Sequence, residues 1–178
     1  TDPKTGEYHE LQQLYGTENR IWVSYDDIPL DLVHAAISIE DKRFPTHKGV
    51  DWIRTLAAVK GFAGGSSSFG GSTITQQLIK NLSQEDEVTV DRKVQEIFRA
   101  LEVEKRYTKS EIMEWYLNTI YLGEGCYGVQ SAARVYFGKK VSDLTTAECA
   151  SLIAITNNPS LYDPYIREEN NRERQLTI

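Results

Sequence analysis

Three short segments carry side chains whose types and spacing could do chemistry. The first spans residues 39–49 and holds the carboxylate pair Glu40 and Asp41, where an apolar helix ends and a proline-broken loop begins. A carboxylate that is half removed from water at such a place can act as a general base. Taken alone, the segment fits equally a solvated glutamate that pairs with Lys42 or Arg43.

In the second segment, two glycines are followed by two hydroxyl residues at the expected start of a helix: Gly70-Gly71-Ser72-Thr73. Free backbone N–H groups and hydroxyls point the same way there, which suits an anion or a sugar. The helix continues with a polar face made of Gln76, Gln77, Lys80 and Asn81. The Gly-Lys-Ser/Thr ending of a nucleotide-binding loop is missing, and an ordinary capped helix with a polar face is the alternative.

The third segment places two cations beside one carboxylate on a predicted helix. Arg92 and Lys93 precede Glu96 by four and three residues, so the three share one flank. Such a group can hold a diphosphate or a metal–phosphate group. When this segment is considered without the other two, ordinary solvated ion pairs are the alternative.

In this order and at these separations, the segments resemble the motifs of the peptidoglycan glycosyltransferases (glycosyltransferase family 51), which occur in class A penicillin-binding proteins and monofunctional transglycosylases. The shared patterns are Glu-Asp-x-x-Phe-x-x-His-x-Gly, Gly-Gly-Ser-Thr-Ile-Thr-Gln-Gln-Leu-x-Lys-Asn and Arg-Lys-x-x-Glu, followed by segments 111–123, 127–139 and 144–148. The likeness covers about residues 5–175. The sequence departs from the family pattern at Pro45, where an aromatic residue is usual, and at Thr156-Asn-Asn-Pro, where Pro-x-x-Pro is more frequent.

The resemblance implies a role for each matching residue. Glu40 and Glu96 would be the essential carboxylates, with Glu40 as the base. The implied substrate-binding positions are Asp41, Phe44, His47, Gly71, Ser72, Thr73, Gln76, Gln77, Lys80, Asn81, Arg92 and Lys93. A divalent metal, Mg²⁺ or Mn²⁺, is left open as a cofactor, with Asp41 and Glu96 as its candidate ligands.

The implied reaction is the polymerisation of lipid II into β-1,4 glycan strands, with inversion at the anomeric carbon. Lys80, Arg92 and Lys93 would stabilise the undecaprenyl diphosphate that leaves. The implied partners are lipid II, the growing glycan chain, a phosphoglycolipid inhibitor of the moenomycin type, and other cell-wall synthesis proteins. A lysozyme-like glycan hydrolase or lytic transglycosylase is the runner-up, although hydrolysis also needs an acid at the glycosidic oxygen. A glycan- or lipid-binding module without catalysis is the third possibility.

Lipid-anchored substrates require contact with a membrane surface. The candidate is an apolar stripe together with an aromatic residue in the glycine-rich loop: Trp52, Ile53, Leu56, Phe62 and Phe69. On pattern alone, a core-facing stripe is equally compatible. We expect the extracytoplasmic face of a bacterial cell membrane, with the anchor outside this chain, because no run of about 18 apolar residues is present.

The 178 residues, 40% of them apolar, suit one domain, taken here as 1–178 of a larger membrane-anchored protein. A net charge of -6 argues against nucleic acid as a partner. Cys126 and Cys149 are expected to be small buried residues, with a pair between them left open.

The elements that must position these segments are mostly helices. We expect them over about 29–40, 50–62, 72–82 and 91–106, the last with an apolar stripe at Val94, Ile97, Phe98 and Leu101. Two capping boxes, Thr108-x-x-Glu111 and Thr145-x-x-Glu148, open further helices, and a charged helix begins near Arg167. A short strand is expected over 20–25. The predicted fold is mostly α, lysozyme-like and two-lobed, with a small β element at the N-terminus and a smaller jaw lobe around the first motif.

Overall fold

The computed structural model describes residues 19–63, 71–83 and 89–178. As predicted, these residues are mostly helical. The helices are α1 (Leu30–Glu40), α2 (Trp52–Ala63), α3 (Ile74–Ser83), α4 (Val90–Arg106), α5 (Lys109–Thr119), α6 (Val129–Phe137), α7 (Thr146–Ile155), α8 (Pro159–Tyr162) and α9 (Glu168–Gln175). Two strands of two residues each, β1 (Asn19–Arg20) and β2 (Cys126–Tyr127), pair in parallel.

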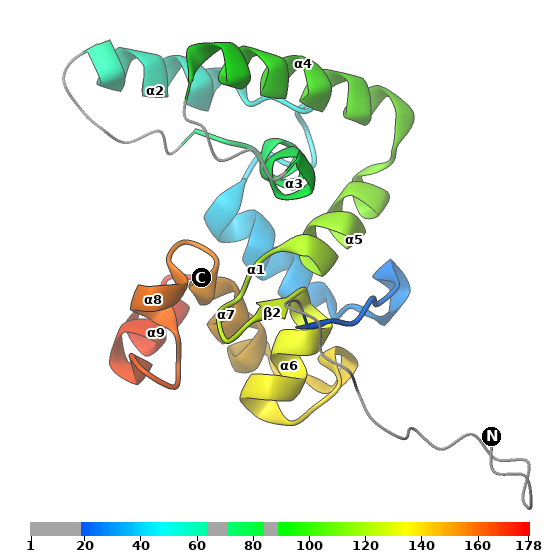
Figure 1. Cartoon of the computed structure of the whole chain (residues 1–178), viewed down its shortest axis with the longest axis vertical. Helices are drawn as coiled ribbons and strands as arrows, with labels where there is room; N and C mark the ends of the chain where they lie inside the picture. Colours follow the sequence, from blue (N-terminus) through cyan, green and yellow to red (C-terminus); the bar gives the residue numbers. More distant parts are fainter. Residues whose placement is uncertain (1–18, 64–70, 84–88) are drawn as a thin grey trace, which may run out of the picture.

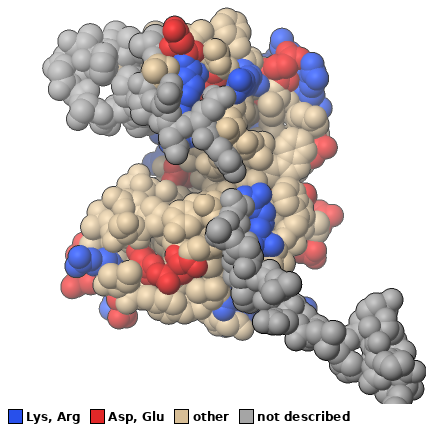
Figure 2. All heavy atoms as spheres, in the orientation of Figure 1, with Lys and Arg blue, Asp and Glu red and all other residues tan. Residues whose placement is uncertain are grey.

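The helices form two lobes (Figure 1). Helices α2, α3 and α4 make the upper lobe, and α1 together with α6 to α9 makes the lower one. The space-filling view is notched between them (Figure 2). Helix α3 packs against both α4 and α5, so it joins the lobes.

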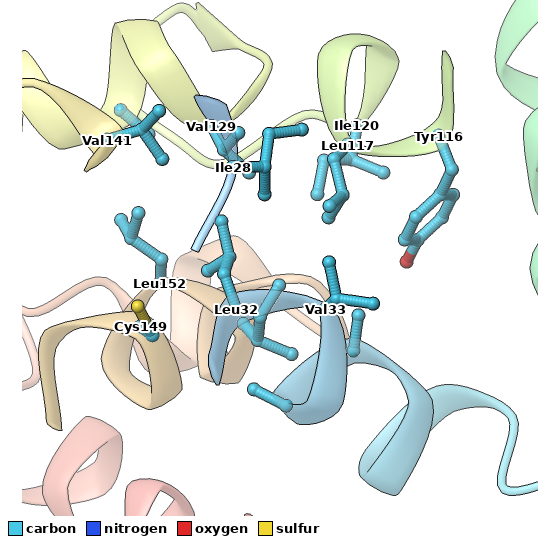
Figure 3. Packing of buried hydrophobic residues seen from close by; sticks show 14 of the residues in the cluster. Ile28, Leu32, Val33, Tyr116, Leu117, Ile120, Val129, Val141, Cys149 and Leu152 are labelled. Atoms are coloured by element: carbon cyan, nitrogen blue, oxygen red, sulfur yellow. The ribbon is translucent and has the colours of Figure 1, made fainter. Parts of the chain in front are cut away.

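The main core lies in the lower lobe and reaches into α3. Leu32 and Val33 of α1 and Leu152 of α7 face Leu117 of α5 and Val129 of α6 (Figure 3). Ile74 and Leu78 extend this cluster along α3, whereas Ile79 belongs to a second, small cluster with Val50 and Ala100. The two faces of α3 are therefore held by two different cores, which fixes its axis.

Both predicted capping boxes are present. The hydroxyls of Thr108 and Thr145 accept from the backbone N–H groups of Glu111 and Glu148, whose carboxylates accept in return from the cap backbone. A cap of this kind contributes about 1 kcal/mol to helix stability. The starts of α5 and α7 are thus set by local sequence.

The segment after Asn158 forms the short helix α8, which the Asn158 side chain caps. Two expectations about the elements are corrected. The strand over 20–25 is not confirmed, because β1 ends at Arg20 and Tyr25–Asp27 forms a 3-10 helix. On α4, Val94 and Phe98 of the predicted apolar stripe are 46% and 67% exposed.

The predicted apolar stripe of α4 is therefore half confirmed. Its other members, Ile97 and Leu101, pack on the small cluster of Val50, Ile79 and Ala100, and Glu96 is only 7% exposed. Lys93, on the charged flank, contacts the hydroxyl of Ser72, which brings that flank toward the start of α3.

Cys126 and Cys149 are both buried and unpaired. Burial raises the pKa of the Cys149 thiol to about 11, so it stays protonated at neutral pH and packs as a small apolar group. Within the described part of the chain, no helix has the length and apolar character needed to cross a bilayer.

Candidate active site

Glu40 is the last residue of α1, and three other elements hold it. Its Oε2 accepts from Nε2 of Gln77 on α3 at 3.0 Å, and its Oε1 accepts from the hydroxyl of Thr156, after α7, at 2.6 Å. Its backbone carbonyl accepts from Nη1 of Arg54 on α2 at 2.6 Å. A cation suits the carbonyl end of a helix. The carboxylate that the sequence singled out is therefore held in a defined orientation where the two lobes meet.

The amide of Gln77 is itself oriented by a buried phenol. Tyr116 is fully buried, and its hydroxyl lies 3.4 Å from Oε1 of Gln77. Burial raises the pKa of Tyr116 well above its ordinary value, and the nearby charges of Glu40 and Asp41 raise it further. The phenol thus stays protonated and donates to Gln77, leaving the amide nitrogen to face Glu40.

Asp41 points away from solvent and toward the start of α3. Its side chain is fully buried, and Oδ2 accepts from the backbone N–H of Ile74 at 3.0 Å. A helix N-terminus stabilises such a charge because its first N–H groups have no partner within the helix. The other oxygen, Oδ1, is buried with no hydrogen-bond partner within the described part of the protein. Asp41 therefore ties the end of α1 to the start of α3.

His47 is the second partner of Asp41. Its Nε2 lies 2.8 Å from Oδ2 of Asp41, and its Nδ1 accepts from the backbone N–H of Gly49 at 3.1 Å. Since Nδ1 is an acceptor, the ring carries its proton on Nε2 and is neutral. Gly49 has φ +93°, and a Cβ there would lie 2.5 Å from the carbonyl oxygen of Ala100, so only glycine allows this loop to lie against α4.

A half-buried ion pair holds this loop in place. Lys109 at the start of α5 donates to the backbone carbonyl of His47 at 2.8 Å and to Glu104 at 2.6 Å. Glu104 also accepts from the hydroxyl of Thr75 at 2.6 Å. The Lys109 ammonium lies 4.3 Å from the centroid of the Phe44 ring, which is itself buried in the core.

The glycine- and hydroxyl-rich segment forms the start of α3. Thr73 and Gln76 make a reciprocal cap, in which each side-chain oxygen accepts from the other residue's backbone N–H. The Thr73 hydroxyl also donates to the carbonyl of Gly49 at 2.7 Å. Gly71 packs on α2, where a Cβ would lie 3.2 Å from Cβ of Ala58. Thr73 and Gln76 are buried, so they position α3 rather than face the notch.

Lys93 of the third motif contacts the segment just described. Nζ of Lys93 lies 2.8 Å from the hydroxyl of Ser72 and 2.5 Å from Oε1 of Glu96. Lys80 of α3 lines one small pocket together with Arg92, Glu96 and Arg99 of α4. The structure thus gathers the predicted basic residues of both helices around a nearly buried carboxylate. Asn81 is exposed one residue beyond Lys80.

Four residues in these contacts were not anticipated from the sequence: Arg54, Glu104, Lys109 and Thr156. Nothing in the spacing of Arg54, Glu104 or Lys109 distinguishes them from other helix charges. Thr156 was marked only as a departure from the family pattern, and that departure was the available signal. Each of them touches a residue of the first or second motif.

The candidate membrane residues are on the surface wherever the structure describes them. Trp52, Ile53 and Leu56 of α2 are each more than half exposed, so the core alternative is wrong for these three. The side chain of Phe62, and Phe69 altogether, lie outside the described residues.

A divalent metal site was left open. Across the described ranges, no three His, Cys, Asp or Glu side chains are grouped as metal ligands. Both candidates are already engaged, Asp41 with His47 and Ile74, and Glu96 with Lys93. As they are paired in the described residues, these side chains do not fit a resident Mg²⁺ or Mn²⁺ site.

A helical two-lobed domain with an oriented carboxylate and gathered cations is what the resemblance to the peptidoglycan glycosyltransferases implied. The chain belongs to the transglycosylase family, which it matches over residues 7–178. Penicillin-binding protein 1A of Aquifex aeolicus (strain VF5) is 42% identical over 183 residues, covering 100% of this chain and 25% of the relative. Penicillin-binding protein 2D of Bacillus subtilis (strain 168) is 46% identical over 168 residues, covering 92% and 24%.

A third relative, penicillin-binding protein 1A of Streptococcus oralis, is 42% identical over 174 residues, which cover 95% of this chain and 27% of that protein. The resemblance to the peptidoglycan glycosyltransferases is confirmed at the level of the family. The chain spans about a quarter of the length of these curated relatives.

Proposed function

We propose that this domain polymerises lipid II into β-1,4 glycan, with Glu40 as the general base. The observation that supports this most is the held carboxylate of Glu40, whose oxygens each accept from a neutral donor at 3.0 Å or less. Neutral donors orient a carboxylate without forming an ion pair with it. An ion pair would instead compete with the proton that a base must take.

A sugar hydroxyl is a weak nucleophile, so it needs a base as the attack proceeds. In the proposed step, Glu40 takes the proton of the GlcNAc 4-hydroxyl while its oxygen bonds to the anomeric carbon of the donor MurNAc. The bond from that carbon to the lipid diphosphate breaks, and the diphosphate leaves with the electron pair. A single displacement of this kind converts an α-linked donor into a β-linked product.

The leaving diphosphate needs charge stabilisation more than a proton. Lys80 and Arg92 line one pocket, and Lys93 is anchored beside it by Glu96 and Ser72. Cations held in place before the reaction stabilise developing charge without reorganisation. We assign Glu96 the role of orienting Lys93, because its carboxylate already accepts from that ammonium.

Because the proposed substrates are anchored to lipid, the domain would have to act at a membrane surface. Exposed Trp52, Ile53 and Leu56 on α2 support this, and α4 adds exposed Val94 and Phe98 in the same lobe. Aromatic and aliphatic side chains of this kind enter the boundary between headgroups and acyl chains. We therefore propose that the upper lobe contacts the extracytoplasmic face of the bacterial membrane.

The test is polymerisation of purified lipid II by the wild type and by Glu40→Gln. General bases typically contribute 10²–10⁴-fold, so kcat should fall by roughly that factor while lipid II still binds. Glu168→Gln, an exposed glutamate on α9, is the matched control and should retain full activity. Undiminished polymerisation by Glu40→Gln would remove Glu40 from the base role.

Incubation with finished peptidoglycan separates synthesis from cleavage. Synthesis predicts polymer from lipid II and no soluble fragments from the finished material. Release of soluble fragments would instead favour the lysozyme-like alternative, which needs an acid at the glycosidic oxygen.

A further inference from the structure

Thr156 is the residue after the last turn of α7, and it contacts Glu40 across 116 positions of sequence. We propose that Thr156 is a positioning residue for Glu40. Its hydroxyl can donate a hydrogen bond to the ionised carboxylate and accept one from the protonated carboxyl group. The proposal rests on the general-base role given to Glu40 above. It concerns a residue outside the three motifs, at a site where this chain departs from the family pattern.

The geometry gives the hydroxyl two acceptors and one proton. Oγ1 of Thr156 lies 2.6 Å from Oε1 of Glu40 and 2.8 Å from the backbone carbonyl oxygen of Ile153, one turn earlier in α7. A hydroxyl has a single O–H donor and two lone pairs. It can therefore donate to only one of these oxygens at full strength at a time.

The two choices correspond to the two states of the base. While Glu40 is ionised, the hydroxyl donates to Oε1 and fixes the plane of the carboxylate. After Glu40 has taken a proton, the hydroxyl turns its own proton to the Ile153 carbonyl and offers Oε1–H a lone pair. The proton then passes to water, which restores the ionised base for the next sugar.

The second partner of Glu40 cannot make this exchange. Gln77 presents its amide N–H₂, which only donates, because Tyr116 donates to its oxygen. A proton on Oε2 would meet this donor, whereas a proton on Oε1 meets an oxygen that can accept. The structure therefore favours Oε1, the oxygen beside Thr156, as the place where the proton resides.

The decisive comparison is between Thr156→Val, which keeps the shape and removes the hydroxyl, and Thr156→Ser, which keeps the hydroxyl. With lipid II as substrate, we expect Thr156→Val to lower kcat by about tenfold to a hundredfold, with KM within about twofold of wild type. Thr156→Ser should keep kcat within about threefold of wild type. Thr156→Ala repeats the comparison should Thr156→Val lower the Tm by more than a few degrees.

Three results would overturn the proposal: wild-type kcat in Thr156→Val, a kcat of Thr156→Ser as low as that of Thr156→Val, or a loss confined to KM. Glu40→Gln is assayed beside them, which distinguishes failure of the Thr156 role from failure of the base assignment. If Glu40→Gln is inactive and Thr156→Val is fully active, only the role of Thr156 is wrong. If Glu40→Gln is active, the base assignment itself is wrong.

Discussion

His47 Nε2 lies 2.8 Å from Asp41 Oδ2, with 8% of the histidine side chain and none of the aspartate side chain exposed. The Nδ1 of the ring also accepts from the backbone N–H of Gly49, so Nε2 is the nitrogen that donates to Asp41. The pair is almost closed off from solvent. The two residues therefore serve the site by joining the end of α1 to α3.

Replacing His47 by Ala should destabilise the domain. The change leaves the buried Asp41 with one donor fewer, and a hydrogen bond to a charged group contributes about 2 kcal/mol. Chemical denaturation should show a loss of that order, together with lower polymerisation activity. His34→Ala is the control, since His34 is exposed on α1 and should leave both quantities unchanged. Equal stability of the two variants would contradict the assigned role.

The contact between Lys93 and Glu96 should matter for turnover. Lys93→Met removes a cation beside the diphosphate and leaves Glu96 nearly buried without its partner. Removing one preorganised donor to a developing charge costs about 10²–10³ in kcat, and we expect a loss in that range. Steady-state kinetics with lipid II measures it.

The matched control for Lys93→Met is Lys105→Met on the same helix, where the lysine pairs with Glu102 in solvent. Activity of the Lys105 variant should stay within about twofold of wild type, because exposed pairs contribute little. A comparable loss in both variants would mean that the effect is not specific to the site.

The loop after Glu40 should carry a pH-dependent part of the stability. Nε and Nη2 of Arg43 donate to the two oxygens of Asp51 at 2.7 and 2.9 Å, and Asp51 also caps α2. Burial by itself would raise the pKa of Asp51, but the Arg43 and backbone hydrogen bonds outweigh it and lower the pKa below 3.8.

A lowered pKa means that the folded state favours the ionised carboxylate. The stabilisation is complete above the unfolded-state value and is lost as the pH falls through the folded-state value. Asp51→Asn should therefore lower the Tm by a few degrees at pH 7, and the difference should shrink below about pH 3.8. Thermal melts at pH 7 and pH 3 measure this, and a difference that does not change with pH would contradict it.

The exposed side chains of α2 should bind lipid. Replacing Trp52, Ile53 and Leu56 together by Ser removes apolar surface that contributes about 1.5–3 kcal/mol per fully buried side chain. Partial insertion should still give at least about a tenfold loss in partitioning to vesicles, measured by co-sedimentation. Leu176→Ser, an equally accessible apolar residue in the lower lobe, is the control and should bind as the wild type does. Unchanged partitioning of the triple variant would contradict the proposed surface.

Local patterns explain how far the sequence could predict this fold. The boxes at Thr108 and Thr145 involve residues three apart, so their helices could be located from spacing alone. The orientation of α4 could be predicted only in part, because Lys93 also contacts Ser72, 21 residues away, while Val94 and Phe98 of the stripe stay exposed. Tertiary contacts of this kind override local amphipathicity.

The same distinction applies to the site. Glu40, the α3 start and the third motif could be selected because their residue types lie close together in the sequence. The contacts of Glu40 with Arg54, Gln77 and Thr156 join positions 14, 37 and 116 residues apart, and no periodicity encodes them. What a sequence cannot supply here is which neutral donor faces each oxygen.

The two hydrogen bonds that hold the Glu40 carboxylate link its orientation to the distance between the lobes. One donor belongs to α3 above and the other follows α7 below. Hydrogen bonds weaken steeply once the heavy atoms are more than about 3.5 Å apart. Gln77 lies 3.0 Å from Oε2, so an opening of the lobes by about half an ångström would bring this contact to that limit and release one oxygen. The carboxylate therefore stays aligned only at this separation of the lobes.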